Sequence, residues 1–240
     1  SASLDGKEVK LSAEENGIVT ATVAEAVKIG QHTFEIAFTN DFNLDGTGLY
    51  KGESGGTAYL FTQMEPVDAR RSFPCWDEPS FKMPWQVSVV IPSEIEAVGN
   101  MPIAQTIQLD AKKRVEFGRS PPMPVYLVAL SVGKFDSTVI EGQPVPGRIY
   151  TVPGQTGLAQ TAKSEIPRLL MELEKYFGVP YPYPKLDHIA VPEFTFGAME
   201  NVGQITYKDA ALLFDATTMS YGQKKFLIEI IAHEMAHMWF

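Results

Sequence analysis

The sequence predicts a mostly β domain, an antiparallel sheet or sandwich, followed by the first part of an α+β domain. Short runs rich in β-branched and aromatic residues recur through the first half, with turn signals such as Asn40-Asp41 and Pro121-Pro122 between them. Beyond Gly133 the pattern changes, because apolar residues within Thr161 to Phe177 take the spacing of one helical face. From Phe226 to the end the chain is largely apolar without Gly or Pro, which is typical of a helix buried inside a domain.

The first half is expected to supply a series of short strands, which we place in a β domain over residues 1–137 that lacks its first strands. Gly, Pro and Asn between the runs supply the turns, and no repeat or low-complexity tract interrupts them. The expected strands are Ile18 to Val23, His32 to Phe38, Thr57 to Gln63, Trp85 to Ile91, Arg114 to Gly118 and Tyr126 to Val132.

The second half, residues 138–240, is expected to mix helices and strands. Glu141 to Gly147 is rich in Gly and Pro, which indicates either a linker or a connecting hairpin. A helix is expected within Thr161 to Phe177, ended by Gly178. Pro167 counts against the full length of this helix and could mark the first turn of a shorter one. Further short strands are expected at Leu186 to Val191 and Gly203 to Tyr207.

The composition is that of an ordinary soluble globular protein, with 45% hydrophobic and 20% charged residues in 240. The net charge of −9 argues against nucleic acid as the main partner and would suit a cationic ligand. Cys75 is the single cysteine, which excludes an internal disulfide. Ser1 to Leu11 carries no signal-peptide pattern, and no apolar run is long enough to span a bilayer. The compartment stays unknown on these grounds, with the cytoplasm weakly favoured.

The end of the chain carries the pattern H-E-x-x-H at His233, Glu234 and His237. Residues four apart in a helix lie on one face, so both imidazoles can hold one metal ion in a geometry that zinc accepts. Glu234 would then lie beside the metal and could take a proton from a bound water. The alternative is a pair of core histidines, but a buried helix with two His and a Glu has polar groups that a metal satisfies directly.

Further stretches match a known family together with this motif. They are Gly197-Ala198-Met199-Glu200-Asn201, Gln63 to Pro66 with Ala69 to Pro79, and Tyr181 to Asp187. In this order they resemble the M1 family of zinc aminopeptidases, over most of the chain. The resemblance implies a saddle-like N-terminal β sheet and then a thermolysin-like catalytic domain. It also implies one Zn²⁺ and removal of the first residue from peptide substrates that have a free N-terminus.

The resemblance implies a role for each residue of the metal motif. His233 and His237 match the first two zinc ligands, and Glu234 matches the general base. The family's third ligand, a Glu, and its oxyanion-stabilising Tyr would lie beyond Phe240. We therefore expect a fragment that binds zinc weakly or not at all and that lacks peptidase activity by itself. We also expect the apolar helix from Phe226 onward to expose hydrophobic surface and to favour self-association.

The resemblance likewise implies a substrate-binding set. Glu200 matches the residue that binds the free α-amino group of the substrate, and Glu65 matches a second contact to that amine from the β domain. Gly197 and Ala198 match the backbone that aligns the scissile peptide, and Met199 would line the pocket for the first side chain. The full expected set is Gln63, Glu65, Gly197, Ala198, Met199, Glu200 and Asn201.

Taken singly, several of these residues have plainer interpretations. Glu200 could cap a turn, Glu65 could be a solvated loop charge, and Met199 could be ordinary core. Other polar residues are expected to be structural. These are Arg70, Arg71, Asp77 and Glu78 in ion pairs that fasten a loop, Cys75 as a small buried hydrophobe, and His32 and His188 as structural or surface residues.

Two competing functions stay open beside the peptidase. The β domain could bind a peptide or another domain, with the His pair vestigial. The chain could also belong to a related M1 hydrolase that acts on an epoxide as well as on peptides. The sequence Gly197-Ala198-Met199-Glu200-Asn201 resembles that of the peptidases rather than that of the relatives that act on an epoxide.

The chemistry of the peptidase is consistent with the residue types. Carboxylates beside a metal suit a terminal ammonium and would make the first residue of a peptide the target.

Overall fold

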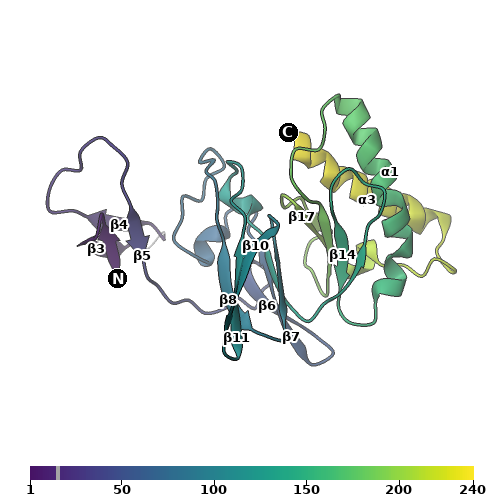
Figure 1. Cartoon of the computed structure of the whole chain (residues 1–240), viewed down its shortest axis with the longest axis horizontal. Helices are drawn as coiled ribbons and strands as arrows, with labels where there is room; N and C mark the ends of the chain where they lie inside the picture. The colour runs from purple at the N-terminus through teal and green to yellow at the C-terminus, as the bar shows by residue number, and fades with distance from the viewer. Residues whose placement is uncertain (15–16) are drawn as a thin grey trace.

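Antiparallel strands dominate the first part of the chain and a mixed sheet with helices follows, which confirms the expected fold class. The structure, a computed structural model, describes residues 1–14 and 17–240. The strands of these residues form five sheets, and the two largest lie side by side in the body of the molecule (Figure 1). No helix in the described ranges combines the length and the apolarity needed to cross a bilayer.

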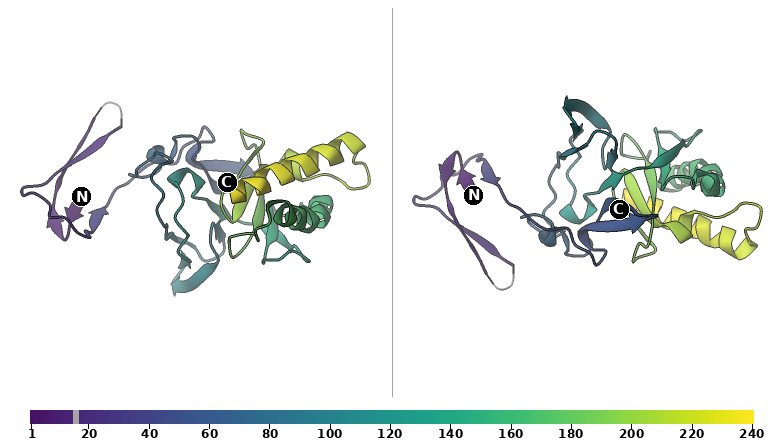
Figure 2. Two further views of the ribbon diagram at one scale, coloured as in Figure 1. Left: turned by 90° about the horizontal axis from the view of Figure 1, so that it is seen from above. Right: turned by 90° about the horizontal axis from the view of Figure 1, so that it is seen from below.

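Two small sheets at the start of the chain stand apart from this body (Figures 1 and 2). One has the order β2-β1-β5, and the other pairs β3 with β4. Most of their side chains are exposed, because a sheet of two or three short strands buries little apolar surface. The strands expected at Ile18 to Val23 and His32 to Phe38 exist but are shorter. The bounds are β1 Ala2–Leu4, β2 Lys7–Glu8, β3 Lys10–Ala13, β4 Val19–Thr22 and β5 Phe34–Ile36.

Two antiparallel sheets, β10-β11-β8 and β6-β7-β12-β9, form the main part of the β domain. They share an apolar core that includes Ile91, Val115, Phe117 and Val132. β7 has the predicted bounds, whereas β6 and β9 are rich in Gly and charge and do not stand out as strands in the sequence. The bounds are β6 Gly48–Ser54, β7 Thr57–Gln63, β8 Ser88–Pro92, β9 Glu96–Gly99, β10 Ile103–Leu109, β11 Lys112–Phe117 and β12 Leu130–Gly133.

The strand expected over Tyr126 to Val132 is wrong in its first half. Val125–Leu127 is a 3₁₀ helix, η2, and β12 begins only after it. The physical reason is that a side chain, rather than a neighbouring strand, satisfies the backbone at this point. The Asn100 amide donates to the Leu127 carbonyl and accepts from the Ala129 N–H, each at 2.8 Å.

A five-stranded mixed sheet, β13-β14-β15-β17-β16, opens the second unit. β13 and β14 are antiparallel, so Glu141 to Gly147 is a connecting hairpin rather than a linker. β14, β15 and β17 run parallel, and β16 is an antiparallel edge strand. β15 is buried along its whole length, as parallel strands covered on both faces are. The bounds are β13 Asp136–Val139, β14 Arg148–Thr151, β15 Asp187–Val191, β16 Ala198–Met199 and β17 Gln204–Lys208.

Helices α1 and α3 pack against each other beside this sheet (Figure 1). α1 ends where predicted, at Gly178, whose φ of 69° is the left-handed C-cap that glycine favours. Pro167 lies inside α1, so the helix is not the shorter one that this proline suggested; the fully buried Ile166 and Leu170 hold the helix face to the core. The bounds are η3 Thr156–Ala159, α1 Gln160–Phe177, α2 Asp209–Leu212, α3 Tyr221–Ala236 and η4 His237–Trp239.

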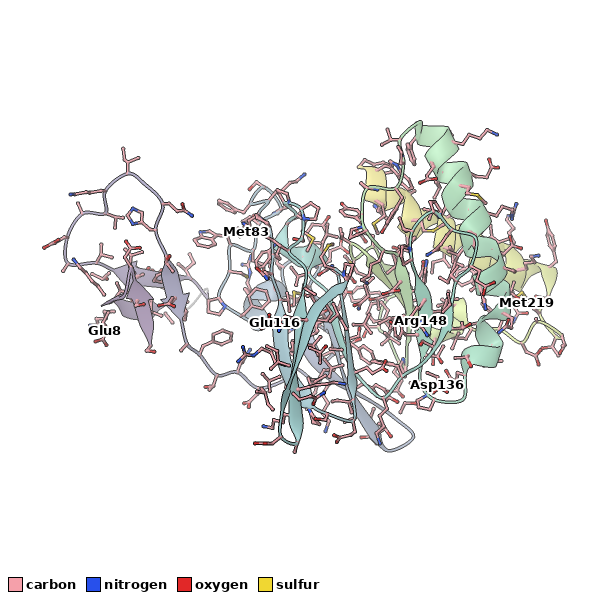
Figure 3. All side chains as sticks on the ribbon, viewed as in Figure 1. Glu8, Met83, Glu116, Asp136, Arg148 and Met219 are labelled. Carbon is pink, nitrogen blue, oxygen red and sulfur yellow. The ribbon has the colours of Figure 1, made fainter. Side chains whose placement is uncertain are left out.

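The four-stranded and five-stranded sheets share a buried aromatic cluster, here termed the inter-sheet core. It consists of Tyr50, Tyr59, Phe61, Val98, Val152, Ile189, Val191, Phe194 and Met199. The two sheets are in direct contact, since Gln63 Nε2 of β7 lies 3.5 Å from Met199 Sδ of β16. Figure 3 shows side chains filling the space between β7 and β14, whereas those around the first small sheets project into the open. The main part of the β domain, from β6 to β12, and the second unit are therefore one packed body, from which the two small sheets stand apart.

The first prediction concerns His188, a fully buried residue of β15 whose pKa burial lowers to about 3, helped by the Lys185 charge. In the unfolded chain the His188 imidazole has a pKa of 6.5 and binds a proton below that pH. In the folded chain it stays neutral down to about pH 3. Folding stability should therefore fall as the pH drops below 6.5, with a slope that approaches about 1.4 kcal/mol per pH unit. Urea unfolding between pH 7 and 5 should show that His188→Leu flattens this slope.

His32 is the matched control for this experiment. It is exposed, and its hydrogen bond to Asp5 raises its pKa. Its contribution is therefore present at low pH and is lost as the pH rises, which is the opposite sign. His32→Gln should leave the acid-side loss of stability in place or enlarge it. An unchanged slope in His188→Leu would show that the folded protein accepts the proton at this position.

Candidate active site

The pair of histidines on α3 is formed by the helix itself. α3 starts at a capping box, in which the Ser220 side chain accepts from the Gln223 N–H and the Gln223 side chain accepts from the Ser220 N–H. The α-helix ends at Ala236, so the expected helix to Phe240 is one turn too long, and His237 opens the 3₁₀ helix η4. Its dihedrals stay helical, and both rings remain on one face.

The chain end tightens into η4 because its aromatic side chains bind to other elements. The Trp239 indole N–H donates to the Val179 carbonyl at 2.9 Å. The Trp239 ring also stacks on Phe177 at the end of α1, with ring centroids 5.2 Å apart. These contacts draw the last turn toward α1, which a periodicity argument on α3 alone does not reveal.

The ring nitrogens of the two histidines converge. The Nε2 atoms of His233 and His237 lie 3.2 Å apart. Two nitrogens bound to one tetrahedral zinc at ordinary distances are separated by about 3.3 Å. A hydrogen bond from one neutral imidazole to the other would give the same distance. The pair therefore fits a zinc ion, and as donors the imidazoles suit that metal.

Glu234 lies between the histidines in sequence and is buried, with 6% of its surface exposed. Burial is the main cause that raises its pKa, to about 8, and the charges of Glu200 and Glu65 add to it. A carboxyl group with this pKa can take up and release a proton near neutral pH.

Glu200 follows directly after the edge strand β16, which pairs with β17 and lies against α3. The Lys208 N–H donates to the Gly197 carbonyl at 2.9 Å and closes the start of this pairing. Gly197 also lies close to the helix, since a Cβ there would be 3.6 Å from Ile230. This packing brings Glu200, Glu234 and His237 together, with one ligand atom of each within 4.8 Å of the others.

Glu65 reaches the same place from the other unit. It follows β7, and the neighbouring Met64 and Ala69 are buried in the core of the β domain. Partial burial and the charge of Glu200 raise its pKa, while His237 lowers it. The carboxylate from the β domain therefore interacts with both the edge strand and the chain end.

The remaining residues of the expected substrate-binding set lie behind these carboxylates. Gln63 and Met199 are buried and touch across the two units, with Gln63 Nε2 3.5 Å from Met199 Sδ. Asn201 is also buried and accepts from the Thr206 hydroxyl at 3.2 Å. Ala198 is half-buried in β16. The side chains of Gln63, Met199 and Asn201 therefore support the positions of Glu65 and Glu200 rather than facing solvent.

Tyr126 is a residue of the site that the sequence patterns did not single out. It lies in η2 and helps to line a hollow of about 600 Å³ together with Tyr183, Glu200 and His237. Burial raises the pKa of its phenol, and the charges of Glu200 and Glu65 add to this. The sequence predicted a strand at this position, so it did not indicate that the Tyr126 ring faces the carboxylates.

The ion pairs expected to fasten a loop are present in the structure. Arg70 pairs with the buried Asp77 at 2.8 Å, and Arg71 pairs with Asp45 at 2.6 Å, so both fasten the loop after β7. Cys75 is half-buried in apolar surroundings, and burial raises the pKa of its thiol to about 12, which argues against a nucleophile.

Two family descriptions match the chain, the Peptidase M1 N-terminal domain over residues 2–127 and the Peptidase family M1 domain over residues 162–240. The chain belongs to peptidase family M1. This M1 chain is 40% identical to Aminopeptidase M1-B of Oryza sativa subsp. japonica, over 95% of its own length and 26% of that protein. It is 37% identical to Aminopeptidase N of Acetobacter pasteurianus, over 94% of its own length and 66% of that protein.

A third relative, Aminopeptidase A of Gloydius brevicauda, is 37% identical over 92% of this chain and 24% of its own length. The M1 chain therefore spans about a quarter of the length of the Oryza and Gloydius proteins. The resemblance drawn from the motifs is confirmed at the level of the family.

The second prediction follows from the mutual repulsion of the carboxylates. In metal-free protein, Glu65→Gln or Glu200→Gln should lower the pKa of Glu234 from about 8, because each removes a negative neighbour. The pKa should stay above 4.5, since burial is the largest cause and persists. Titration of ¹³C-labelled glutamate carboxyls by NMR measures it.

Glu229→Gln is the control for this titration. Glu229 lies on the same helix, is exposed, and pairs with Lys225 at 3.5 Å. It is not among the charges that raise the pKa of Glu234, which are those of Glu200 and Glu65. A pKa of Glu234 that moves equally in all three variants would contradict the assignment of the repulsion to Glu65 and Glu200.

Proposed function

We propose that this M1 chain carries the metal-binding and amine-recognising residues of an aminopeptidase, which removes the first residue from peptides with a free amino terminus. The observation that carries the proposal is the meeting of Glu65, Glu200 and Glu234 beside the paired imidazoles of His233 and His237. The names of the relatives, all aminopeptidases, support it.

Glu65 and Glu200 suit a terminal ammonium. Each carboxylate raises the pKa of a neighbour, so the negative charges of the cluster repel one another. An ammonium placed between them relieves the repulsion and forms charge-assisted hydrogen bonds. An acylated terminus has no such charge and would leave the carboxylates unpaired. The two residues thereby set the first peptide bond, and not an internal one, at the reacting position.

His233 and His237 would hold a zinc ion through their Nε2 atoms. When bound, zinc polarises the scissile carbonyl and lowers the pKa of a water molecule. Glu234 is the base that takes the proton from the attacking water and returns it to the leaving amine. Nearby positive charge, from a cation or from the substrate ammonium, would lower the pKa of Glu234 and ionise it for the first of these transfers.

The third prediction tests the base. In the complete protein that contains this chain, Glu234→Gln should reduce kcat on an aminoacyl anilide by about 10² to 10⁴, since the amide cannot accept the proton. Metal content, measured by atomic absorption, should not change, because Glu234 is not a ligand in this scheme. Glu229→Gln, exposed on the same helix, should retain full activity.

A Glu234→Gln enzyme with normal turnover would refute the proposed base. The N-acetylated anilide provides a second arm, because it lacks the ammonium that Glu65 and Glu200 recognise. Equal cleavage of the acetylated and free substrates would refute the aminopeptidase assignment while leaving a metal-dependent hydrolase possible.

The fourth prediction tests the metal site without reference to activity. Co²⁺ titrated into the complete protein that contains this chain should give the visible absorption of a low-coordinate cobalt–imidazole site. His233→Gln and His237→Gln should each weaken binding by about 10²-fold or more, since even partners of metal ligands are worth 10- to 100-fold. His32→Gln, which alters an exposed histidine paired with Asp5, should bind like the unchanged chain. Cobalt spectra that survive both ligand changes would place the ion elsewhere.

A further inference from the structure

Glu200 is held in place by the turn that follows it. Asn201 to Gly203 leads from the edge strand β16 into β17, and the Gln204 N–H donates to the Asn201 carbonyl at 3.2 Å. Gly203 has a φ of 70°, in the left-handed region, so this turn has a specific shape. The carboxylate of Glu200 can stand at the site only while the turn keeps its place.

Within the described residues, one side chain of the β domain hydrogen-bonds to this turn, and the Val202 side chain of the turn is also buried in the core of that domain. Asn100, in the loop after β9, is buried with 6% of its surface exposed. Its amide nitrogen donates to the Val202 carbonyl at 2.8 Å. The Asn100 backbone also lies against Gly203, where a Cβ would overlap the Asn100 carbonyl. The turn after Glu200 therefore rests directly on Asn100.

The same amide also fixes the other wall of the site. The second N–H of Asn100 donates to the Leu127 carbonyl, and its oxygen accepts from the Ala129 N–H, each at 2.8 Å. Leu127 adjoins Tyr126, whose ring lines the hollow beside Glu200. Both hydrogens of the amide and its oxygen are thus used, two toward η2 and one toward the turn.

From its other side, the turn is held by a buried ion pair. Lys185 Nζ donates to the Gly203 carbonyl and to Asp187, each at 2.7 Å. This contact belongs to the same unit as Glu200 and does not relate it to the β domain. Asn100 is therefore the hydrogen-bonding contact, beside the burial of Val202 in the β-domain core, that relates Glu200 to η2 with Tyr126. Glu65 emerges from the same domain, after β7.

We propose that Asn100 is a positioning residue for amine recognition, which keeps Glu200 in register with Tyr126 and Glu65 across the two units. This inference rests on the proposed function for the role of Glu200. Loss of the Asn100 donors would not move the imidazoles of His233 and His237, because α3 and η4 hold these residues in place. It would displace the turn after Glu200 and weaken binding of an amine selectively.

Asn100→Asp in the complete, zinc-loaded protein is the test. The carboxylate keeps the shape and the acceptor for Ala129 but faces two carbonyls without a donor. Affinity for alaninamide, measured by calorimetry, should fall about tenfold or more, while zinc affinity stays unchanged. Hydrogen exchange should become faster at Gly203 and Gln204 and near Leu127 together.

Ser131→Ala is the matched control. The Ser131 hydroxyl accepts from the Gln204 side chain at 2.8 Å, so it is another buried hydrogen bond between the units that does not reach the turn carbonyls. It should lower the melting temperature without a selective loss of alaninamide affinity. Equal affinity losses in Asn100→Asp and Ser131→Ala, or an unchanged affinity in Asn100→Asp, would overturn the proposal.

Two further arms keep the outcomes separate. If Asn100→Asp does not fold, exchange in the unmodified protein decides, because alaninamide should slow exchange at Gly203 and near Leu127 together; slowing at only one of them overturns the proposal. If the unmodified protein does not distinguish alaninamide from N-acetyl-alaninamide, the amine role of Glu200 fails. The coupled exchange at the two segments in Asn100→Asp would then still report whether Asn100 joins the walls.

Discussion

The inter-sheet core is the contact on which the rest of the site depends. Tyr59 and Phe61 of β7 bury their rings against Ile189 and Met199 of the five-stranded sheet. Fully burying an aromatic or large aliphatic side chain is worth about 1.5–3 kcal/mol, so a cluster of this size strongly opposes separation of the two sheets. β7 ends just before Glu65 and β16 just before Glu200. The packing of the strands thus fixes the separation of the carboxylates that follow them.

This arrangement explains how the chain holds three carboxyl groups close together. Burial is the largest cause of the raised pKa values of Glu65 and Glu234, and repulsion between the carboxylates adds to it. Glu65 is held by the core behind Met64, Glu200 by the turn and edge strand, and Glu234 by a buried helix face. The free energy of packing in three elements offsets the repulsion. A cation bound between the carboxylates would relieve that repulsion.

Much of this could be predicted from residues and spacing. The H-E-x-x-H motif placed His233 and His237 on one face because helix geometry is local, and the run after a Gly-rich turn gave the bounds of β7. Tyr126 could not be found in this way. Its position depends on the Asn100 amide, which is distant in sequence and replaces a β ladder with two side-chain bonds. The last turn at His237 was missed for a similar reason, since Trp239 binds Val179 and Phe177 across the chain.

The same distinction separates the two kinds of residue in the G-A-M-E-N stretch. A sequence motif marks Met199, Glu200 and Asn201 alike, but strand geometry sends neighbouring side chains to opposite faces. Met199 therefore enters the inter-sheet core, and Glu200 emerges at the end of the edge strand beside α3. Asn201 turns inward again and binds Thr206. Glu200 reaches the site beside α3 because its two neighbours are buried, so the stretch packs the edge strand as well as placing the carboxylate that we propose binds the substrate amine.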